Sequence, residues 1–196
     1  MKTYRSPAEI VSEIESVLAQ AHPHPGADPV LESVVDLLYG GRHYFWIGIY
    51  LNVGSRAVRQ VFRGPVPPCH SFEFGKGNVG TAGQNGVTKV IADVSTDPSY
   101  SMCFAETKSE IVVPLKIGTH VLGVIDAESE KPNAFGSEDR VLLEQVAQRL
   151  ARFLATAGKY IVARARREAQ SQPQRHAPAS ERPAETQARR AAGDKG

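Results

Sequence analysis

Apolar residues recur at helical spacing near both ends of the chain. After a capping box at residues 6–9, they follow one face of a helix that ends at the histidine–proline segment 22–26. A second helix runs from Pro29 to the glycine pair at 40 and 41, and a long C-terminal helix begins at Ser137 and continues to about residue 168. These segments predict helices that share one core.

Short apolar or alternating runs between these helices predict strands. The glycine-rich segment 75–80 fits a tight turn into a short helix at 79–85 better than a phosphate-binding loop, because it lacks the context of a dinucleotide fingerprint. The order of elements indicates an α+β fold with an antiparallel sheet. The expected strands are residues 43–51, 58–62, 70–74, 88–92, and a hairpin of 109–117 with 120–127.

The first expected strand has two apolar faces. Phe45, Ile47 and Ile49 share one face, which suits the core, and Trp46 and Tyr50 lie on the other with only Gly48 between them. The aromatic face fits the wall of a pocket and a second packed layer equally well. The pattern leaves both interpretations open.

Length and composition limit the classes of protein to consider. The 196 residues suffice for one domain with a sizeable core, and no apolar run approaches the roughly 20 residues of a membrane helix. Because the first residues lack the apolar segment of a signal peptide, we expect a cytoplasmic protein. Two cysteines do not make a disulfide framework, and the sequence has no recognisable zinc-binding motif. His22 and His24 alternate with prolines and fit a solvated turn better than a metal site.

The charge is unevenly distributed. The net charge is +2, yet residues 158–196 carry nine basic and four acidic side chains, so the preceding part is mildly acidic. After residue 169 large apolar residues almost vanish, which is typical of a disordered tail. The tail lacks a folded reading element, so we expect a solvated extension without a nucleic-acid partner.

The most distinctive chemistry lies between residues 99 and 128. Cys103 precedes two strands that carry Glu110, Asp126 and Glu128 at or near their ends. Buried carboxylates are costly unless paired or used, and Asp126 and Glu128 point to the same face because they are two positions apart. The alternative is a structural role, in which Cys103 is a small buried residue and the acids only cap the strand ends. The aromatic pair aligned with these acids favours a functional site.

Over roughly residues 5–158 the chain resembles a GAF domain and, more narrowly, the free methionine-R-sulfoxide reductases. The order and spacing of the motifs together carry this resemblance. The motifs are WIGIYL at 46–51, Cys69 six residues before Gly75, GKGNVGTA at 75–82, Asp93 with Val94, Cys103 followed by SEIV at 109–112, and VIDAES at 124–129.

The resemblance implies redox roles for both cysteines. Cys103 falls where the family has its catalytic cysteine, and Cys69 matches a second cysteine that forms the recycling disulfide. Attack of Cys103 on sulfur would release methionine and leave a sulfenic acid, which Cys69 would convert to a disulfide. An external dithiol such as thioredoxin would then reduce the pair, without a metal or organic cofactor.

The resemblance also implies a substrate site. Glu110, Asp126 and Glu128 match carboxylates that bind and polarise the sulfoxide, and Trp46 and Tyr50 match aromatic side chains that close over the methionine. One carboxylate kept protonated by its like-charged neighbours would donate a proton to the sulfoxide oxygen.

We therefore expect a GAF-like single domain at residues 1–160, with a central antiparallel sheet of about six strands and the N-terminal and C-terminal helices packed on it. Residues 161–196 are expected to form a helix extension and the disordered basic tail. The resemblance favours a homodimer that reduces free methionine-R-sulfoxide or a similar small ligand under oxidative stress, with a thioredoxin-like reductant and no membrane partner.

Three positions depart from the family pattern. Val79 replaces a further cysteine of the glycine turn, Phe104 replaces an aspartate after the catalytic cysteine, and Glu128 replaces an aspartate that is one methylene shorter. These departures support the alternative function, a non-catalytic GAF module that senses a small ligand or redox state.

Overall fold

A computed structural model describes residues 3–22 and 29–171 of the chain. The greater part of the histidine–proline turn, residues 23–26, and the basic tail from residue 172 onward lie outside this range. The elements in order are α1 (Pro7–Gln20), α2 (Pro29–Gly41), β1 (Trp46–Val53), β2 (Arg56–Arg63), β3 (Ser71–Glu73), α3 (Gly77–Asn85), β4 (Lys89–Ile91), the 3₁₀ helix η1 (Val94–Thr96), β5 (Ser109–Ile117), β6 (His120–Ser129), α4 (Ser137–Ala155) and α5 (Lys159–Ser171).

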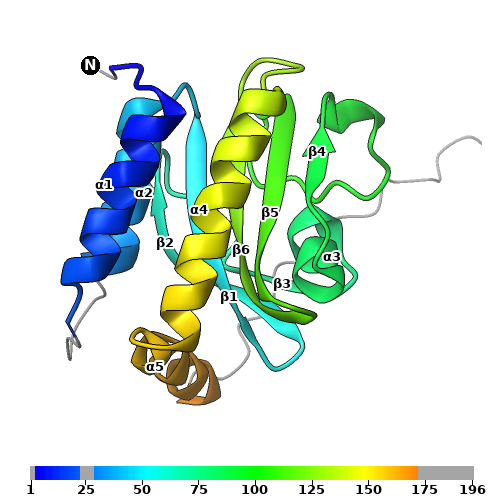
Figure 1. Cartoon of the computed structure of the whole chain (residues 1–196). Coiled ribbons are helices and arrows are strands. Elements are labelled where there is room, and N and C mark those ends of the chain that lie inside the picture. The colour runs from blue at the N-terminus through cyan, green and yellow to red at the C-terminus, as the bar shows by residue number, and fades with distance from the viewer. Residues whose placement is uncertain (1–2, 23–28, 172–196) are drawn as a thin grey trace, which may run out of the picture.

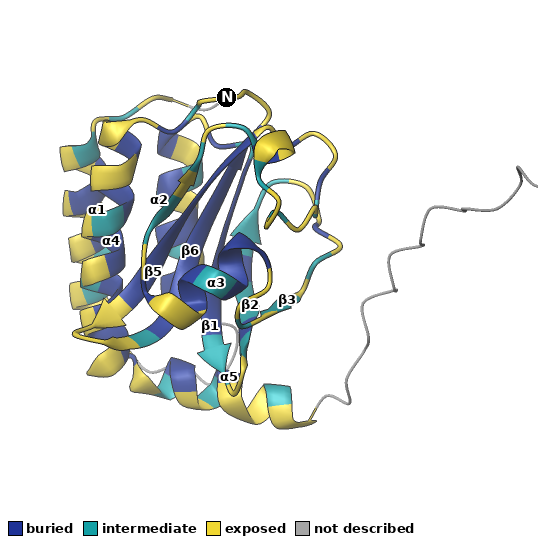
Figure 2. Cartoon of the chain, turned by 90° about the vertical axis from the view of Figure 1, so that its right-hand side faces the viewer, coloured by how far each residue is buried: buried dark blue, intermediate teal, exposed yellow. Residues whose placement is uncertain are grey.

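Six strands of the described residues form one antiparallel sheet in the order β3-β2-β1-β6-β5-β4. Helices α1, α2 and α4 lie along one face of this sheet, and α3 lies on the opposite face (Figure 1). The buried surfaces of the strands face the buried surfaces of the helices in the layer between them (Figure 2). The predicted α+β architecture and its six-stranded antiparallel sheet are confirmed.

The main core fills the space between the sheet and the helix layer. Ile47, Ile49 and Leu51 of β1 point into it, together with buried residues of α1, α2, α4 and α5. The prediction that Phe45 shares this face is wrong: Phe45 precedes β1, so the strand alternation does not extend to it, and its ring packs against Phe104 on the opposite side of the sheet. The expected capping box is present, because the Ser6 hydroxyl accepts from the Glu9 amide and the Glu9 carboxylate accepts from the Ser6 amide.

The glycine-rich turn delivers the chain into α3, as predicted. The helix starts at Gly77, two residues before the expected position. A Cβ atom at Gly80 would lie 2.0 Å from the carbonyl oxygen of Glu73, so only glycine lets α3 pack this closely on the chain that leaves β3.

The long C-terminal helix predicted to reach about residue 168 is in fact two helices. Thr156 leaves the helical region of backbone conformation, and the amides of Thr156 and Gly158 both donate to the carbonyl of Phe153. This arrangement ends α4 and turns the chain into α5, whose Ile161 and Val162 return to the main core. The helical periodicity missed the break because apolar residues occur on both sides of it.

Candidate active site

The sheet register brings the three acidic residues together on the face opposite the main helix layer. Glu128 of β6 pairs with Trp46 of β1 on one side and with Glu110 of β5 on the other. Asp126 lies two positions away on the same face, between Gly48 of β1 and a residue of β5. Residues from the two neighbouring strands β5 and β6 thus form one carboxylate cluster, which we define as Glu110, Asp126 and Glu128.

The carboxylate cluster is buried, and burial disfavours negative charge. Each of the three side chains belongs to a residue that is at most 4% exposed. Burial and the charge of Glu128 raise the pKa of Glu110 to about 8, and burial raises the pKa of Glu128 to about 7. Burial and the charges of both neighbours raise the pKa of Asp126 well above its ordinary value. The cluster therefore holds at least one proton at neutral pH.

Two polar side chains orient the outer members of the cluster. Thr107 Oγ1 donates a hydrogen bond to Glu128 Oε2. Asn78 Nδ2 donates to Glu110 Oε2 at 2.7 Å and to Asp97 Oδ2 at 2.9 Å. Asn78 comes from the first turn of α3, so the glycine-rich turn presents an amide to the cluster. Sequence reasoning missed Asn78 and Thr107, because their contacts link segments at least 19 residues apart.

Asp126 differs from its neighbours in its hydrogen bonding. No N–H or hydroxyl group of the described residues donates to its buried Oδ1 atom, and Trp46 Nε1 likewise has no acceptor; a proton held by Glu110 or Asp126 can join these two carboxyls in a hydrogen bond. Buried polar atoms are nearly always hydrogen-bonded in folded proteins, so each such atom needs an explanation. A bound polar ligand on this face of the sheet would supply one.

The aromatic residues of β1 form a second packed cluster beside the carboxylates. Trp46 and Tyr50 are fully buried, with ring centroids 6.3 Å apart, and Phe104 lies 6.0 Å from Trp46. The indole lies over Gly48, where an added Cβ would come within 2.3 Å of Trp46 Cη2. The structure thus favours a packed second face, which borders the carboxylates because Trp46 pairs with Glu128.

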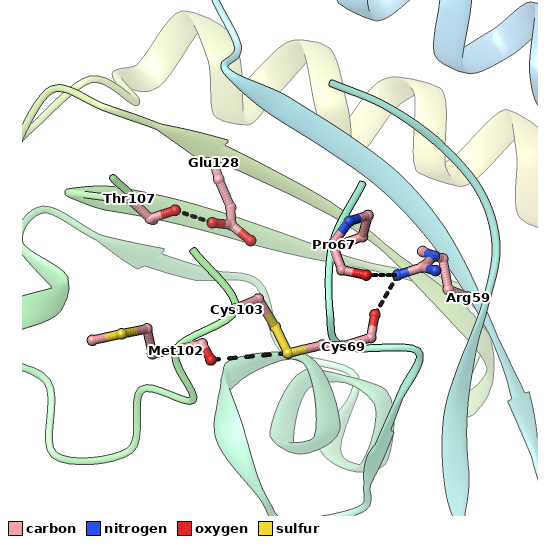
Figure 3. The surroundings of a disulfide bond; sticks show 7 residues. All are labelled: Arg59, Pro67, Cys69, Met102, Cys103, Thr107 and Glu128. Carbon is pink, nitrogen blue, oxygen red and sulfur yellow. Dashed lines mark hydrogen bonds between the residues drawn. A yellow bond between two sulfur atoms is a disulfide. The ribbon is translucent and has the colours of Figure 1, made fainter. Parts of the chain in front are cut away.

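The two cysteines form a disulfide bond between two loops. Their Cα atoms are 5.7 Å apart although 34 residues separate them in the chain. Cys103 packs against the aromatic cluster, and Glu128 projects from β6 toward the loop that carries Cys103 and Thr107 (Figure 3). The structure therefore brings together both cysteines, the carboxylates and the aromatic pair, while the roles expected for these seven residues stay predictions.

Arg59 of β2 holds the loop that carries Cys69. Its Nη1 atom donates to the carbonyl oxygens of Pro67 and Cys69, and its guanidinium lies 4.9 Å from the centre of the Phe62 ring. On the other loop, the Met102 carbonyl lies 3.9 Å from Cys69 Sγ. No sequence pattern indicated Arg59, since its partners are backbone atoms of a loop without periodicity.

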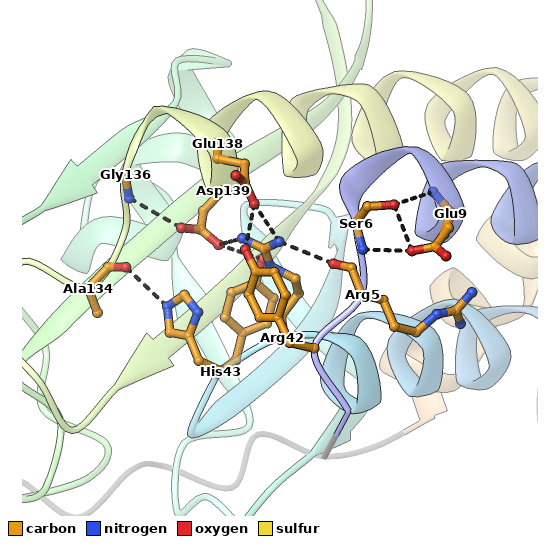
Figure 4. A network of polar contacts seen from close by, with 11 residues as sticks. Arg5, Ser6, Glu9, Arg42, His43, Ala134, Gly136, Glu138 and Asp139 are labelled. Carbon is orange, nitrogen blue, oxygen red and sulfur yellow. Dashed lines mark hydrogen bonds and ion pairs between the residues drawn. The ribbon is translucent and has the colours of Figure 1, made fainter.

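A second buried polar group lies in the helix layer, away from this site. Arg42 forms ion pairs with Glu138 at 2.7 Å and Asp139 at 2.8 Å (Figure 4). Its guanidinium carbon also lies 4.5 Å from the centre of the Tyr4 ring. The pKa of Glu138 is lowered by its hydrogen bonds from Tyr4 and Arg42. This group fastens the N-terminal segment to the start of α4, so we assign it a structural role.

Within residues 3–22 and 29–171, no group of three or more metal-ligating side chains is suitably placed for an ion. None of the helices in this part of the chain is long and apolar enough to cross a membrane.

The fold and the site define a class of protein. The sequence pattern of the GAF domain matches residues 22–154, and the chain belongs to this family. Within it, the chain is similar to proteins named free methionine-R-sulfoxide reductase. The identity is 36% over 107 residues with the protein from Saccharomyces cerevisiae, covering 53% of this chain and 59% of that one. With the protein from Escherichia coli it is 33% over 111 residues, covering 57% and 67%.

A solved structure gives the same relationship in three dimensions. Free methionine-R-sulfoxide reductase from Neisseria meningitidis, in complex with its substrate, superposes with a TM-score of 0.71 at 29% identity and covers 82% of this chain and 98% of its own. The curated relatives match over about two thirds of their length or less. The predicted resemblance is confirmed, and it supports an oxidoreductase.

Proposed function

We propose that the protein reduces free methionine-R-sulfoxide to methionine with its own cysteines as the reductant. One observation carries the proposal: a disulfide-forming cysteine pair lies beside a buried carboxylate cluster that retains a proton. A sulfoxide needs both a nucleophile for sulfur and a proton for oxygen, and this face of the sheet supplies both. Relatives named for this activity support the assignment.

The first step joins Cys103 to the substrate. The Cys103 thiolate attacks the sulfoxide sulfur while the carboxylate cluster donates a proton to the oxygen. The S–O bond then breaks as the oxygen passes to the cysteine sulfur, which releases methionine and leaves Cys103 as a sulfenic acid. Asp126 is the proposed contact for the substrate's polar groups, because no N–H or hydroxyl group of the described residues donates to its buried Oδ1 atom.

The second step uses Cys69. Its thiol attacks the sulfenic sulfur of Cys103, the oxygen leaves as water, and the disulfide seen in the structure forms. An external dithiol, proposed to be a thioredoxin, restores both thiols and is itself oxidised to a disulfide. The net reaction converts a sulfoxide and a dithiol into a sulfide, a disulfide and water.

The aromatic pair has a proposed binding role. Trp46 and Tyr50 border the carboxylate cluster with apolar ring faces and would contact the methyl and methylene groups of methionine. Glu110 and Glu128, oriented by Asn78 and Thr107, would share the acid role with Asp126.

The test is turnover of free methionine-R-sulfoxide with thioredoxin, thioredoxin reductase and NADPH, measured as methionine formed. The wild type is expected to turn over and Cys103→Ser to form none. Cys69→Ser is expected to form about one methionine per chain and then stop with Cys103 as a sulfenic acid that dimedone labels. Ligand binding without methionine formation by the wild type would overturn the proposal and favour the sensory alternative.

A further inference from the structure

We propose that Arg59 is a positioning residue for the second cysteine. Its guanidinium fixes the backbone of the loop that carries Cys69, so that the Cys69 thiol lies within reach of Cys103 before the disulfide forms. This inference rests on the proposed function, because it concerns the step in which Cys69 attacks the sulfenic acid. It assigns a role to a residue of β2 that lies outside the carboxylate cluster.

A β-bulge in β2 places the Arg59 side chain on the side of the sheet that carries the site. The pairing of β2 with β1 shifts by one residue between Arg59 and Val61. Val61 packs in the main core, whereas the next residue, Phe62, packs against the aromatic cluster on the opposite face. Arg59 pairs with Tyr50 of that cluster, so the bulge brings Arg59 and Phe62 to one face, although strict alternation separates residues three positions apart. The Arg59 guanidinium carbon lies 4.9 Å from the centre of the Phe62 ring, a cation–π contact that restricts the side chain.

Arg59 holds the backbone at Cys69 and on both sides of it. Its Nη1 atom donates to the carbonyl oxygen of Pro67 at 3.5 Å and to that of Cys69 (Figure 3). Its backbone amide donates to the carbonyl of His70 at 3.0 Å. The bonds from the side chain are charge-assisted, which makes them stronger than bonds between neutral groups. The side chain thus fixes the loop up to Cys69, and the main chain fixes the residue after it.

Apart from the burial of Pro67, little else fixes the segment before Cys69. The backbone of residues 64–69 forms no hydrogen bond with another backbone group among the described residues. Val66 in this segment is 81% exposed. A segment with so few contacts is free to move once the Arg59 side chain is removed.

The geometry of a disulfide makes a small displacement of this loop decisive. The Cα atoms of Cys69 and Cys103 are 5.7 Å apart. A disulfide requires this distance to stay below about 7 Å, so a displacement of Cys69 by about 1.3 Å uses up the margin. On the other loop, Cys103 packs against the aromatic cluster and is followed by the buried Phe104, so the position of the Cys69 loop is the one that needs a separate anchor.

The anchored step is the closing of the disulfide. The Cys69 thiolate forms the S–S bond as the S–O bond of oxidised Cys103 breaks, and the oxygen leaves as water with the sulfenic proton and the Cys69 thiol proton. An intramolecular reaction of this kind is fastest when the reacting atoms are already held close together.

The experiment measures the equilibrium between the reduced and the oxidised full-length chain in mixtures of reduced and oxidised glutathione. Free thiols are alkylated and counted by mass spectrometry, which gives the equilibrium constant for the Cys69–Cys103 disulfide. No sulfoxide is present, so the outcome does not depend on whether the protein reduces methionine sulfoxide.

The test variant is Arg59→Met, which keeps an unbranched apolar side chain but removes the charge and both side-chain hydrogen bonds, and Arg59→Lys restores the charge. The matched control is Arg56→Met on the same strand. Burial lowers the pKa of His70, and the charges of Arg59 and Arg56 lower it further, so both arginines lie near the residue after Cys69. The side-chain hydrogen bonds to the loop come from Arg59, so the control removes a similar charge without removing a loop contact.

We expect Arg59→Met to lower the equilibrium constant for disulfide formation by about tenfold, because the loop of the reduced chain is then no longer held in place. Arg59→Lys is expected to fall between Arg59→Met and the wild type, and Arg56→Met to stay within about twofold of the wild type. A loss below about threefold in Arg59→Met, or an equal loss in Arg56→Met, would overturn the role of Arg59. Urea unfolding of the reduced chains is measured in parallel, and a lower midpoint with an unchanged glutathione equilibrium would show a structural role only.

Trapping of the sulfenic acid tests the step itself. The reduced wild type and Arg59→Met are mixed with free methionine-R-sulfoxide and dimedone. We expect equal release of methionine and at least about threefold more dimedone on Cys103 in the variant, because Cys69 then competes less well for the sulfenic acid. Equal labelling would overturn the positioning role. Absence of methionine with both proteins would count against the proposed function alone, and the glutathione equilibrium would then decide the role of Arg59.

Discussion

Replacement of Glu110 by glutamine is expected to stabilise the fold at alkaline pH and to impair the proposed reaction. The wild type must bury the Glu110 carboxylate beside Asp126 and Glu128, whereas glutamine keeps the side-chain shape and stays neutral. Its amide oxygen can still accept the hydrogen bond from Asn78, which lies 2.7 Å from Glu110 Oε2 in the wild type. The change therefore removes buried negative charge with little change in packing.

The magnitude follows from the raised pKa. The pKa of Glu110 moves from 4.5 to about 8 on folding, and each unit corresponds to about 1.4 kcal/mol. The native state binds more protons than the unfolded state between these values, so the free energy of unfolding falls as pH rises through this window. The upper bound is about 5 kcal/mol. Because the carboxylates titrate together, we expect the variant to be more stable than the wild type by about 2 kcal/mol at pH 9.

The assay is urea unfolding of the oxidised protein at pH 5 and pH 9, followed by circular dichroism. At pH 5 the Glu110→Gln variant and the wild type are expected to differ by less than about 1 kcal/mol, because Glu110 is protonated in the native state and the pH is only slightly above its unfolded pKa of 4.5. Glu130→Gln, an exposed position just beyond β6, is the matched control and should follow the wild type at both pH values. Methionine formation is measured in parallel and is expected to fall in the Glu110→Gln variant.

Two results would refute this reasoning. A wild type whose stability is constant or rises from pH 5 to pH 9 would show that the carboxylate cluster keeps no extra proton. A Glu110→Gln variant less stable than the wild type at pH 9 would show that the carboxylate contributes favourable contacts that outweigh its buried charge.

Three further substitutions test the site and the fold. Gly48→Ala should displace the indole of Trp46, whose Cη2 would lie 2.3 Å from the new Cβ, and lower the free energy of unfolding by about 1–3 kcal/mol. Because Trp46 is the only tryptophan, a change in its fluorescence spectrum reports the displacement, and an unchanged spectrum would contradict it. Asn78→Leu removes a hydrogen bond that lowers the pKa of Glu110, so the carboxyl titration seen by carbon-13 NMR should move to higher pH; no upward shift would exclude this role for the amide. Arg42→Met leaves the buried Asp139 carboxylate unpaired and should lower the free energy of unfolding in urea by about 3 kcal/mol, without changing the rate at which dithiothreitol reduces the disulfide. A loss below about 1 kcal/mol would show that the ion pairs add little to stability.

Local patterns in the sequence determined the elements and their faces. Apolar spacing and the capping box located α1, and alternation assigned Ile47 to the main core and Trp46 to the opposite face. These signals are local, since a helix or strand repeats its side-chain directions every few residues. The motif resemblance added the family and the expected cysteine pair, which periodicity alone does not supply.

Only the tertiary structure decided which distant residues meet. Strand register sets Glu128 between Trp46 and Glu110, and the path of two loops brings Cys69 to Cys103 across 34 residues. The contacts of Asn78 and Thr107 with the carboxylate cluster have no periodic signature, because they join a helix start and a loop to separate strands. Burial then sets the protonation of the cluster, since the cost of a charge depends on everything packed around it and on no single stretch of sequence.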